Sequence, residues 1–243
     1  MNLQDKVAIV TGSTRGIGRA IAEALVRNGA RVTVSGRSQP DSERVAAEIA
    51  RAAGDGKEST TLPVACDVRR LQDCQQLVSQ TLDRFGRLDI LVNNAGIGAF
   101  APVAEMSPET WDAVLETNLS GVFYCTNAAL PHLRKAGDAW VINIGSLAGK
   151  NAFPNGAAYN ASKFGLIGFS EALMQEVRYD NIRVSYVMPG SVATEFNGRE
   201  ASEGEDWRIA AEDVAQVVLD VLGSASRTLV SRVEMRPSQP PRR

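Results

Sequence analysis

The feature that most constrains the fold is a glycine-rich turn between a short apolar run and a helical segment. After Val7–Thr11 the chain continues Gly12-Ser13-Thr14-Arg15-Gly16-Ile17-Gly18, and apolar residues then recur three and four positions apart. Here Gly12 permits a tight turn, Gly16 lets the backbone approach a phosphate, and Gly18 lets helix and strand pack closely. Free N–H groups at the helix start attract anions. The turn predicts a dinucleotide phosphate site with the spacing G-x3-G-x-G, although a plain strand-to-helix turn is the alternative.

Six further apolar runs alternate with helical segments along the chain. The runs are too continuous for strands with one face in water and are typical of parallel strands covered by helices on both sides. This alternation predicts a doubly wound α/β fold, a seven-stranded parallel sheet between two helical layers. The expected strands are Val7–Thr11, Val32–Ser35, Thr61–Val68, Leu88–Gly96, Ala139–Ser146, Arg183–Gly190 and Thr228–Met235.

Length and patterning predict one domain over residues 1–243, without repeats or a linker. Two segments depart from the alternation. Residues 191–211 form a long polar stretch between a strand and a helix, which predicts a substrate lid. Residues 237–243 are rich in proline and arginine and are expected to be mobile, or ordered only by a neighbouring subunit.

Composition excludes several classes of function. The net charge of −2 lacks the basic footprint of a nucleic-acid-binding protein. We also expect no membrane span and no signal peptide. Three scattered cysteines without a CxxC pattern indicate neither a disulfide framework nor a metal site, and they favour a cytoplasmic setting. The single histidine, His132, lies in an apolar and basic helical pattern and is expected to be structural.

The second expected strand distinguishes between the two nicotinamide cofactors. An acidic residue about 20 positions after the glycine turn would bind the ribose 2′-hydroxyl of NAD. Instead the strand ends in Ser35-Gly36-Arg37-Ser38, and Arg15 lies in the turn itself. Two guanidinium groups suit a 2′-phosphate, so the sequence favours NADP(H) over NAD(H). The alternative is a pair of solvated surface arginines.

A second set of residues indicates proton transfer. Tyr159 and Lys163 are four apart at the start of a helix that continues to about Arg178, so they share one face. An ammonium beside a phenol lowers the phenol pKa, which suits Tyr159 to exchanging a proton with a substrate. Ser146 ends the fifth strand, where sites form in this architecture, and could stabilise a substrate oxygen. A surface i,i+4 pair is the alternative for Tyr159 and Lys163 alone.

Together these motifs resemble the short-chain dehydrogenase/reductase family over nearly the whole chain. Further matches are Asp67-Val68, Asn93-Asn94-Ala95-Gly96, Asn118, and Pro189-Gly190 followed by Thr194. The resemblance implies Asn118, Ser146, Tyr159 and Lys163 as the catalytic set, with Asn118 supporting a proton-relaying water. Packing or a helix kink is the alternative for Asn118. The resemblance further implies cofactor contacts at Gly12, Thr14, Arg15, Gly16, Ile17, Gly18, Arg37, Asp67, Val68, Asn94, Ala95, Gly96, Tyr159, Lys163, Pro189, Val192 and Thr194.

The implied activity is hydride transfer between NADP(H) and a carbonyl or secondary alcohol, as in carbonyl reductases and 3-oxoacyl-carrier-protein reductases. A carrier-protein partner is doubtful because Gln175 and Glu176 replace the usual basic docking residues and the expected lid is acidic. Phe153, Phe196 and Trp207 could line an apolar pocket or serve packing.

The remaining expectations concern the assembly of the chain and two other classes of function. The family suggests a homotetramer or homodimer formed through the two long helices after strands four and five. The alternative function is that of an NADP-binding regulator or scaffold without catalytic activity. A serine hydrolase using Ser146 is remote, because no G-x-S-x-G turn is present and His132 is poorly placed.

Overall fold

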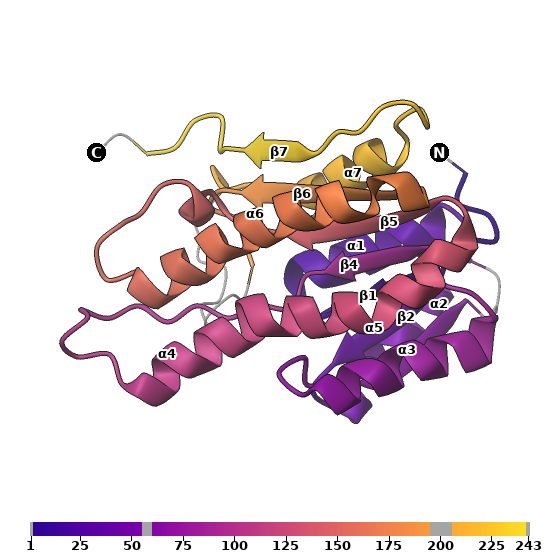
Figure 1. Cartoon of the computed structure of the whole chain (residues 1–243), viewed down its shortest axis with the longest axis horizontal. Helices are drawn as coiled ribbons and strands as arrows, with labels where there is room; N and C mark the ends of the chain where they lie inside the picture. The colour runs from indigo at the N-terminus through magenta and orange to yellow at the C-terminus, as the bar shows by residue number, and fades with distance from the viewer. Residues whose placement is uncertain (1, 55–59, 195–205, 242–243) are drawn as a thin grey trace.

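The computed structural model describes residues 2–54, 60–194 and 206–241. They form a parallel sheet of seven strands in the order β3-β2-β1-β4-β5-β6-β7 (Figure 1). The strand order reverses between β1 and β4, which is where a doubly wound sheet binds its ligand. The expected fold class is therefore confirmed. The strands are β1 (Val7–Val10), β2 (Arg31–Gly36), β3 (Thr61–Ala65), β4 (Ile90–Asn93), β5 (Ala139–Ile144), β6 (Ile182–Pro189) and β7 (Arg232–Met235).

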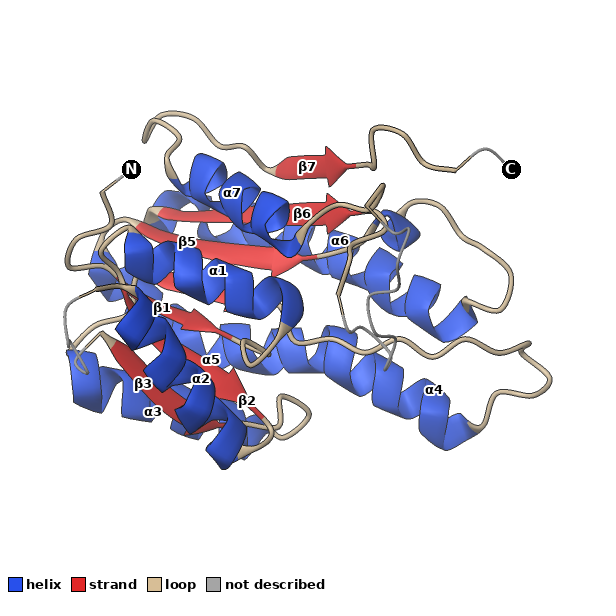
Figure 2. Ribbon diagram, turned by 180° about the vertical axis from the view of Figure 1, so that it is seen from behind, coloured by secondary structure: helices blue, strands red, loops and turns tan. Residues whose placement is uncertain are grey.

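Helices cover both faces of the sheet. One layer holds α1, α2 and α7, and the other holds α3, α5 and α6, with α4 continuing the line of α5 beyond the sheet (Figure 2). Each layer packs on the sheet through its own cluster of buried apolar side chains. The helices are α1 (Gly16–Arg27), α2 (Gln39–Ala52), α3 (Leu71–Phe85), α4 (Pro108–Leu115), η1 (Glu116–Ser120), α5 (Gly121–Ala136), η2 (Leu147–Gly149), α6 (Ala157–Val177), η3 (Arg178–Asp180) and α7 (Ala211–Leu222).

Strand boundaries differ from expectation in the centre of the sheet as well as at its edges, since the expected strand Leu88–Gly96 shortens to β4, Ile90–Asn93. The last expected strand began at Thr228, but β7 begins at Arg232 and pairs only with β6, from Tyr186 to Pro189. An edge strand forms hydrogen bonds on one side only, so apolar pattern alone extends it too far. The central strands β1, β4 and β5 are buried along their whole length, as parallel strands between helical layers should be.

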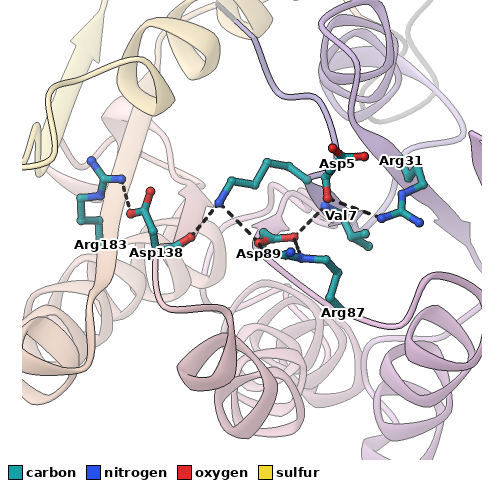
Figure 3. Close-up of polar contacts among 8 residues, drawn as sticks. Asp5, Val7, Arg31, Arg87, Asp89, Asp138 and Arg183 are labelled. Carbon is teal, nitrogen blue, oxygen red and sulfur yellow. Dashed lines mark hydrogen bonds and ion pairs between the residues drawn. The ribbon is translucent and has the colours of Figure 1, made fainter.

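The amino ends of the central strands are joined by buried charge (Figure 3). Asp89, just before β4, is fully buried. Its carboxylate accepts hydrogen bonds from the backbone N–H of Val7 at 2.9 Å, from Arg87, and from Lys6 at 3.4 Å. Nearby, Arg183 on β6 forms an ion pair with Asp138, just before β5. Lys6 also donates to the Asp138 carbonyl at 3.2 Å, so these contacts connect the amino ends of β1, β4, β5 and β6.

The expected lid, residues 191–211, lies partly outside the described residues. At its base, Val192 and Ile209 form a parallel bridge, and Ala193 N–H donates to the Ile209 carbonyl at 2.9 Å. Residues 195–205, which include Phe196 and the acidic positions except Asp206, lie outside the described part. The expected tail is described as far as residue 241 and follows the carboxyl end of β7 (Figure 1).

Candidate active site

The glycine turn forms one wall of a cleft at the carboxyl ends of the strands. Gly12 and Gly16 have φ values of +63° and +53°, which only glycine adopts easily. Gly18 has a packing role, because a Cβ there would lie 2.4 Å from the Gly12 carbonyl oxygen and 2.3 Å from Nδ2 of Asn94. The three glycines therefore give the turn its shape and bring it against the loop after β4.

That loop is held by Thr11, a residue that sequence reasoning missed. Its hydroxyl accepts from the N–H groups of Asn94 and Ala95 at 3.0 and 3.1 Å. In return, the Asn94 amide donates to the carbonyls of Thr11 and Gly12. Asn94 thus holds the glycine turn in place through these two hydrogen bonds. It also lines the cleft beside Gly96. A buried hydroxyl directly after a strand carries no sequence pattern that predicts such a bond.

Five arginines line the end of the cleft beside α2. Three are already in ion pairs: Arg19 with Glu23 and Glu48, Arg44 with Asp41 and Glu48, and Arg69 with Asp67. Arg15 and Arg37 are exposed and form no salt bridge within the described residues. The two arginines singled out from the sequence are therefore the two whose guanidinium groups remain available to an anion.

Asp67 and Val68 lie in the same part of the cleft. The Asp67 carboxylate accepts from the Arg69 side chain and, at 3.1 Å, from the Arg69 backbone N–H, and these bonds lower the pKa of Asp67. Val68 is buried against Gly121, where a Cβ would lie 2.8 Å from the valine side chain. An adenine ring bound here would share the Asp67 carboxylate with Arg69, a competition that the sequence did not predict.

Ser146, Tyr159 and Lys163 meet at the opposite end of the cleft. Ser146 follows β5, and its hydroxyl accepts from the Ala148 N–H at 3.1 Å. Tyr159 and Lys163 project from the first turns of α6, with the lysine Nζ 5.8 Å from the centre of the tyrosine ring. Lys163 is buried and donates to the Ile144 carbonyl at 3.0 Å. The structure therefore brings the three predicted side chains together.

The electrostatics differ from the expectation of a lowered tyrosine pKa. Burial raises the pKa of Tyr159, and a hydrogen bond with Ser146 opposes that rise. Burial also lowers the pKa of Lys163 to about 8. Desolvation outweighs the effect of the Ser146 hydrogen bond, so the net shift of the Tyr159 pKa is upward. A phenol that keeps its proton suits donation to a carbonyl oxygen rather than abstraction from an alcohol.

Asn118 lies in a π-helical turn that separates α4 from α5. Its side-chain amide accepts from Ile97 N–H and donates to the Ile97 carbonyl, both at 2.8 Å, and also donates to the Ser162 hydroxyl at 3.0 Å. Asn118 therefore joins the loop after β4 to α6, next to Lys163. π-Helical turns interrupt α-helices mostly where a side chain has a special position to reach.

The predicted Pro189, Val192 and Thr194 line the cleft where β6 ends. The whole cleft encloses about 830 Å³. Its glycine turn, its free guanidinium groups at one end and its buried lysine at the other fit a dinucleotide. Thr14 and Ile17 line the cleft at the turn. Ser38, Arg44, Cys66, Ile97 and Gly145 also line it, without a motif that would have identified them.

Two other sequence expectations can be compared with the structure. His132 lies near the end of α5, whereas Ser146 follows the strand that comes next, so the two residues are at opposite ends of β5. Such an arrangement gives no serine–histidine pair. The cysteines are less scattered than their positions suggest, since the sulfur atoms of Cys74 and Cys125 are 3.4 Å apart in the core. Within the described residues, no helix is both long enough and apolar enough to cross a membrane.

Known proteins share both the sequence and the fold. Residues 6–205 match the short chain dehydrogenase family. A 3-oxoacyl-[acyl-carrier-protein] reductase of Synechocystis is 39% identical over 80% of this chain and 77% of its own. A metagenomic short-chain oxidoreductase solved with NADP has a TM-score of 0.84 and 37% identity, covering 98% and 99% of the two chains.

Another similar structure contains the other nicotinamide cofactor. It is a 3-ketoacyl-(acyl-carrier-protein) reductase from Brucella melitensis solved with NADH, with a TM-score of 0.84 and 29% identity, covering 96% and 97% of the two chains. The chain therefore belongs to the short-chain dehydrogenase family and is an oxidoreductase of the hydride-transferring kind.

Proposed function

We propose that the protein is an NADP(H)-dependent reductase of ketones, with 3-oxoacyl compounds as the other substrate class, and that Tyr159 provides the proton. The observation that carries the proposal is the meeting of Ser146, Tyr159 and Lys163 at the carboxyl end of β5, in the same cleft as the glycine turn. A bound nicotinamide supplies the hydride at the carbonyl carbon. Reduction also needs a proton at the carbonyl oxygen, and Tyr159, whose pKa is raised by burial, holds one.

Each residue of the set has a distinct task in this mechanism. Tyr159 donates its proton as negative charge develops on the carbonyl oxygen. The Ser146 hydroxyl orients the same oxygen and stabilises its charge. Lys163, already bonded to the Ile144 carbonyl, holds the ribose hydroxyls of the cofactor and influences the proton affinity of Tyr159. Asn118 keeps the loop after β4 in place and supports a water that relays protons towards Lys163.

The preference for NADP(H) rests on Arg15 and Arg37, which form no salt bridge within the described residues. A 2′-phosphate accepts bidentate bonds from such groups. The remaining cofactor contacts are Gly12, Thr14, Gly16, Ile17, Gly18, Asp67, Val68, Asn94, Ala95, Gly96, Tyr159, Lys163, Pro189, Val192 and Thr194. All of these positions except Gly18 line the cleft, and Gly18 packs against Gly12 and Asn94, which do.

We also propose that residues 1–243 act as one catalytic domain and that the chain forms a homotetramer or homodimer through α5 and α6. The helix α6 buries Leu166 and Leu173 on the sheet side and leaves Phe164 46% exposed. An exposed aromatic side chain on a helix otherwise packed on the sheet suits a partner surface. Light scattering gives the mass in solution, and a monomeric mass would contradict this assembly.

The test of the function is a turnover assay that follows NADPH absorbance over a panel of ketones, aldehydes and 3-oxoacyl thioesters. We expect turnover with at least one ketone, and we expect Tyr159→Phe to lower kcat by about 100-fold or more while NADPH still binds. A silent NADP-binding regulator would give no turnover on the whole panel. If Tyr159→Phe retained most of the turnover, the assignment of the proton donor would be wrong.

A further inference from the structure

Two phenylalanines with large exposed faces lie beside the proposed proton donor. Phe100, in the loop after β4, is 49% exposed, and Phe153, in the loop after η2, is 42% exposed. The Phe100 ring lies 5.6 Å from the Tyr159 ring, centre to centre, at 74°, and 5.7 Å from the Phe153 ring at 52°. These are the distances and tilted angles of favourable aromatic pairs. The three rings form a continuous aromatic cluster, of which Tyr159 also lines the cleft.

The aromatic cluster is held by backbone bonds and does not depend on one flexible loop. Ala101 N–H donates to the Asn155 carbonyl at 2.9 Å, which joins the two loops. The Asn160 side chain accepts from Phe153 N–H at 3.3 Å and donates to the Ala148 carbonyl at 2.7 Å. These bonds fix Phe100 and Phe153 in place before any substrate arrives. A preformed apolar surface costs less to occupy than one that must be ordered on binding.

The Phe153 ring packs directly against the backbone of Gly156. A Cβ at this position would lie 2.5 Å from the ring and 2.6 Å from Oδ1 of Asn160. Any side chain at 156 would therefore move the Phe153 ring or break the Asn160 bond. The absence of a side chain at Gly156 is what lets Phe153 take its place next to Phe100.

The charge around the aromatic cluster is low. In the segments 96–107 and 145–157, which carry both rings, Lys150 is the only basic side chain before Lys163. The Lys150 ammonium is 2.8 Å from a carboxylate oxygen of Glu234 on β7 and so is already paired. These two segments thus provide an aromatic surface without a free cation for a phosphate or carboxylate on the substrate. That differs from the other end of the cleft, where five arginines gather.

We propose that Phe100 and Phe153 form the binding site for the apolar part of the substrate, and that this part is an aromatic or alicyclic ring on an uncharged ketone. The inference rests on the proposed ketone reduction and narrows its substrate class. The Phe100 ring packs on the Tyr159 ring and the Phe153 ring packs on Phe100, so a ketone bound at the Tyr159 hydroxyl can place its apolar part on the surface that begins at Phe100. Flat apolar groups gain both burial and ring–ring attraction on such a surface.

The test compares three substrates on the whole protein with NADPH: acetophenone, dihydroxyacetone and acetoacetyl-coenzyme A. We expect wild-type protein to have its highest kcat/KM with acetophenone. The variants Phe100→Ala and Phe153→Ala should each raise the KM for acetophenone by about 3- to 10-fold. The fall in kcat/KM should be at least about 3-fold larger for acetophenone than for dihydroxyacetone, because the lost contact binds the ring and not the carbonyl.

Two further variants separate a binding role from a folding defect. Tyr179→Ala removes an 88% exposed ring beyond the far end of α6, a helix of 21 residues and so about 30 Å long. It should leave the KM for acetophenone unchanged. Gly156→Ala displaces the Phe153 ring without altering either phenylalanine, and it should raise that KM as Phe153→Ala does. Thermal unfolding of each variant shows whether it is folded at the assay temperature.

Different results overturn different parts of the account. An unchanged KM for acetophenone in folded Phe100→Ala and Phe153→Ala would overturn the aromatic site while leaving ketone reduction intact. The same holds if wild-type protein prefers dihydroxyacetone or acetoacetyl-coenzyme A. If none of the three compounds oxidises NADPH but other carbonyls of the wider panel do, the ring substrate is wrong and the reductase stands. If no carbonyl compound reacts, both are overturned.

Discussion

Charged side chains are paired with one another at the amino ends of the strands, but the buried lysine at the carboxyl ends lacks an ion-pair partner within the described residues. At the amino ends, the buried Asp89 carboxylate is bonded to Val7, Arg87 and Lys6, so each charge has its partner within the protein (Figure 3). At the carboxyl ends, the Lys163 ammonium is buried with a backbone carbonyl as its acceptor, and no salt bridge to it occurs within the described residues. Burial accordingly lowers the pKa of Lys163 to about 8.

Because of this difference, the amino ends of the strands contribute mainly to stability and the carboxyl ends mainly to function. At the amino ends these charged side chains are paired with one another. They hold the strands in register and themselves offer no unpaired group to a ligand. Groups at the carboxyl ends keep unused bonding capacity: the glycine turn presents N–H groups, and Arg15 and Arg37 present free guanidinium groups. Buried polar groups without protein partners cost stability and are retained where a ligand completes them. The comparison predicts that substitutions at one end unfold the protein and that those at the other end disable it.

The largest expected effect is on stability at the amino ends of the strands. Asp89→Ala leaves Arg87 and Lys6 beside an apolar gap and the Val7 N–H without its acceptor, which should lower the free energy of unfolding by about 3–5 kcal/mol. Asp180→Ala is the control: this side chain, just before β6, pairs with Arg134, but the two side chains are 35% and 52% exposed, so the loss should be below about 1 kcal/mol. Urea denaturation measures both. Equal losses would remove the distinction between buried and exposed charge at this end.

The next effect is on cofactor binding at the carboxyl ends of the strands. The double variant Arg15→Ala/Arg37→Ala should weaken NADPH binding by about 100-fold, equivalent to about 2.7 kcal/mol, through loss of two charge-assisted contacts. NADH lacks the 2′-phosphate and should bind with nearly unchanged affinity. Arg51→Ala, an exposed arginine near the end of α2, serves as the control. Fluorescence titration gives the dissociation constants. An equal loss for both cofactors would show that the two arginines do not read the 2′-phosphate.

The smallest expected effect is a pH dependence of stability without cofactor. The folded-state pKa of Lys163, about 8, lies below its usual 10.5. Between these values the unfolded chain holds a proton that the folded chain releases, so rising pH favours the folded state. From pH 8.5 to 9.5, wild-type stability should therefore rise relative to Lys163→Met by about 1.2 kcal/mol. Paired urea denaturations measure this difference. A constant difference over that range would place the lysine in a polar environment instead.

The sequence predicted those parts of the molecule that depend on local pattern. Buried parallel strands carry continuous apolar runs, and the glycine turn requires glycines at set positions, so the fold class and the turn could be predicted. Ser146, Tyr159 and Lys163 were identified because strand ends and helix spacing place them in one region. The structure adds that burial raises the pKa of Tyr159, which depends on packing that no single segment contains.

The remaining features depend on contacts between distant segments. Asp89 and Val7 are 82 positions apart, and the Thr11 hydroxyl meets the Asn94 backbone across 83 positions. Phe100 carries no motif, and only the tertiary structure brings it against Tyr159. The start of β7 was predicted four residues too early, because an edge strand is decided by pairing geometry as much as by composition.

The central claim, that a ketone is reduced by direct hydride transfer in the cleft, is tested most directly by deuterium transfer. NADPH deuterated at C4 of the nicotinamide, with each of the two C4 positions labelled in a separate sample, is incubated with protein and ketone, and the alcohol is analysed by mass spectrometry. We predict one deuterium on the carbinol carbon from one of the two samples, and loss of that product in Tyr159→Phe. Alcohol without deuterium from either sample would contradict the claim.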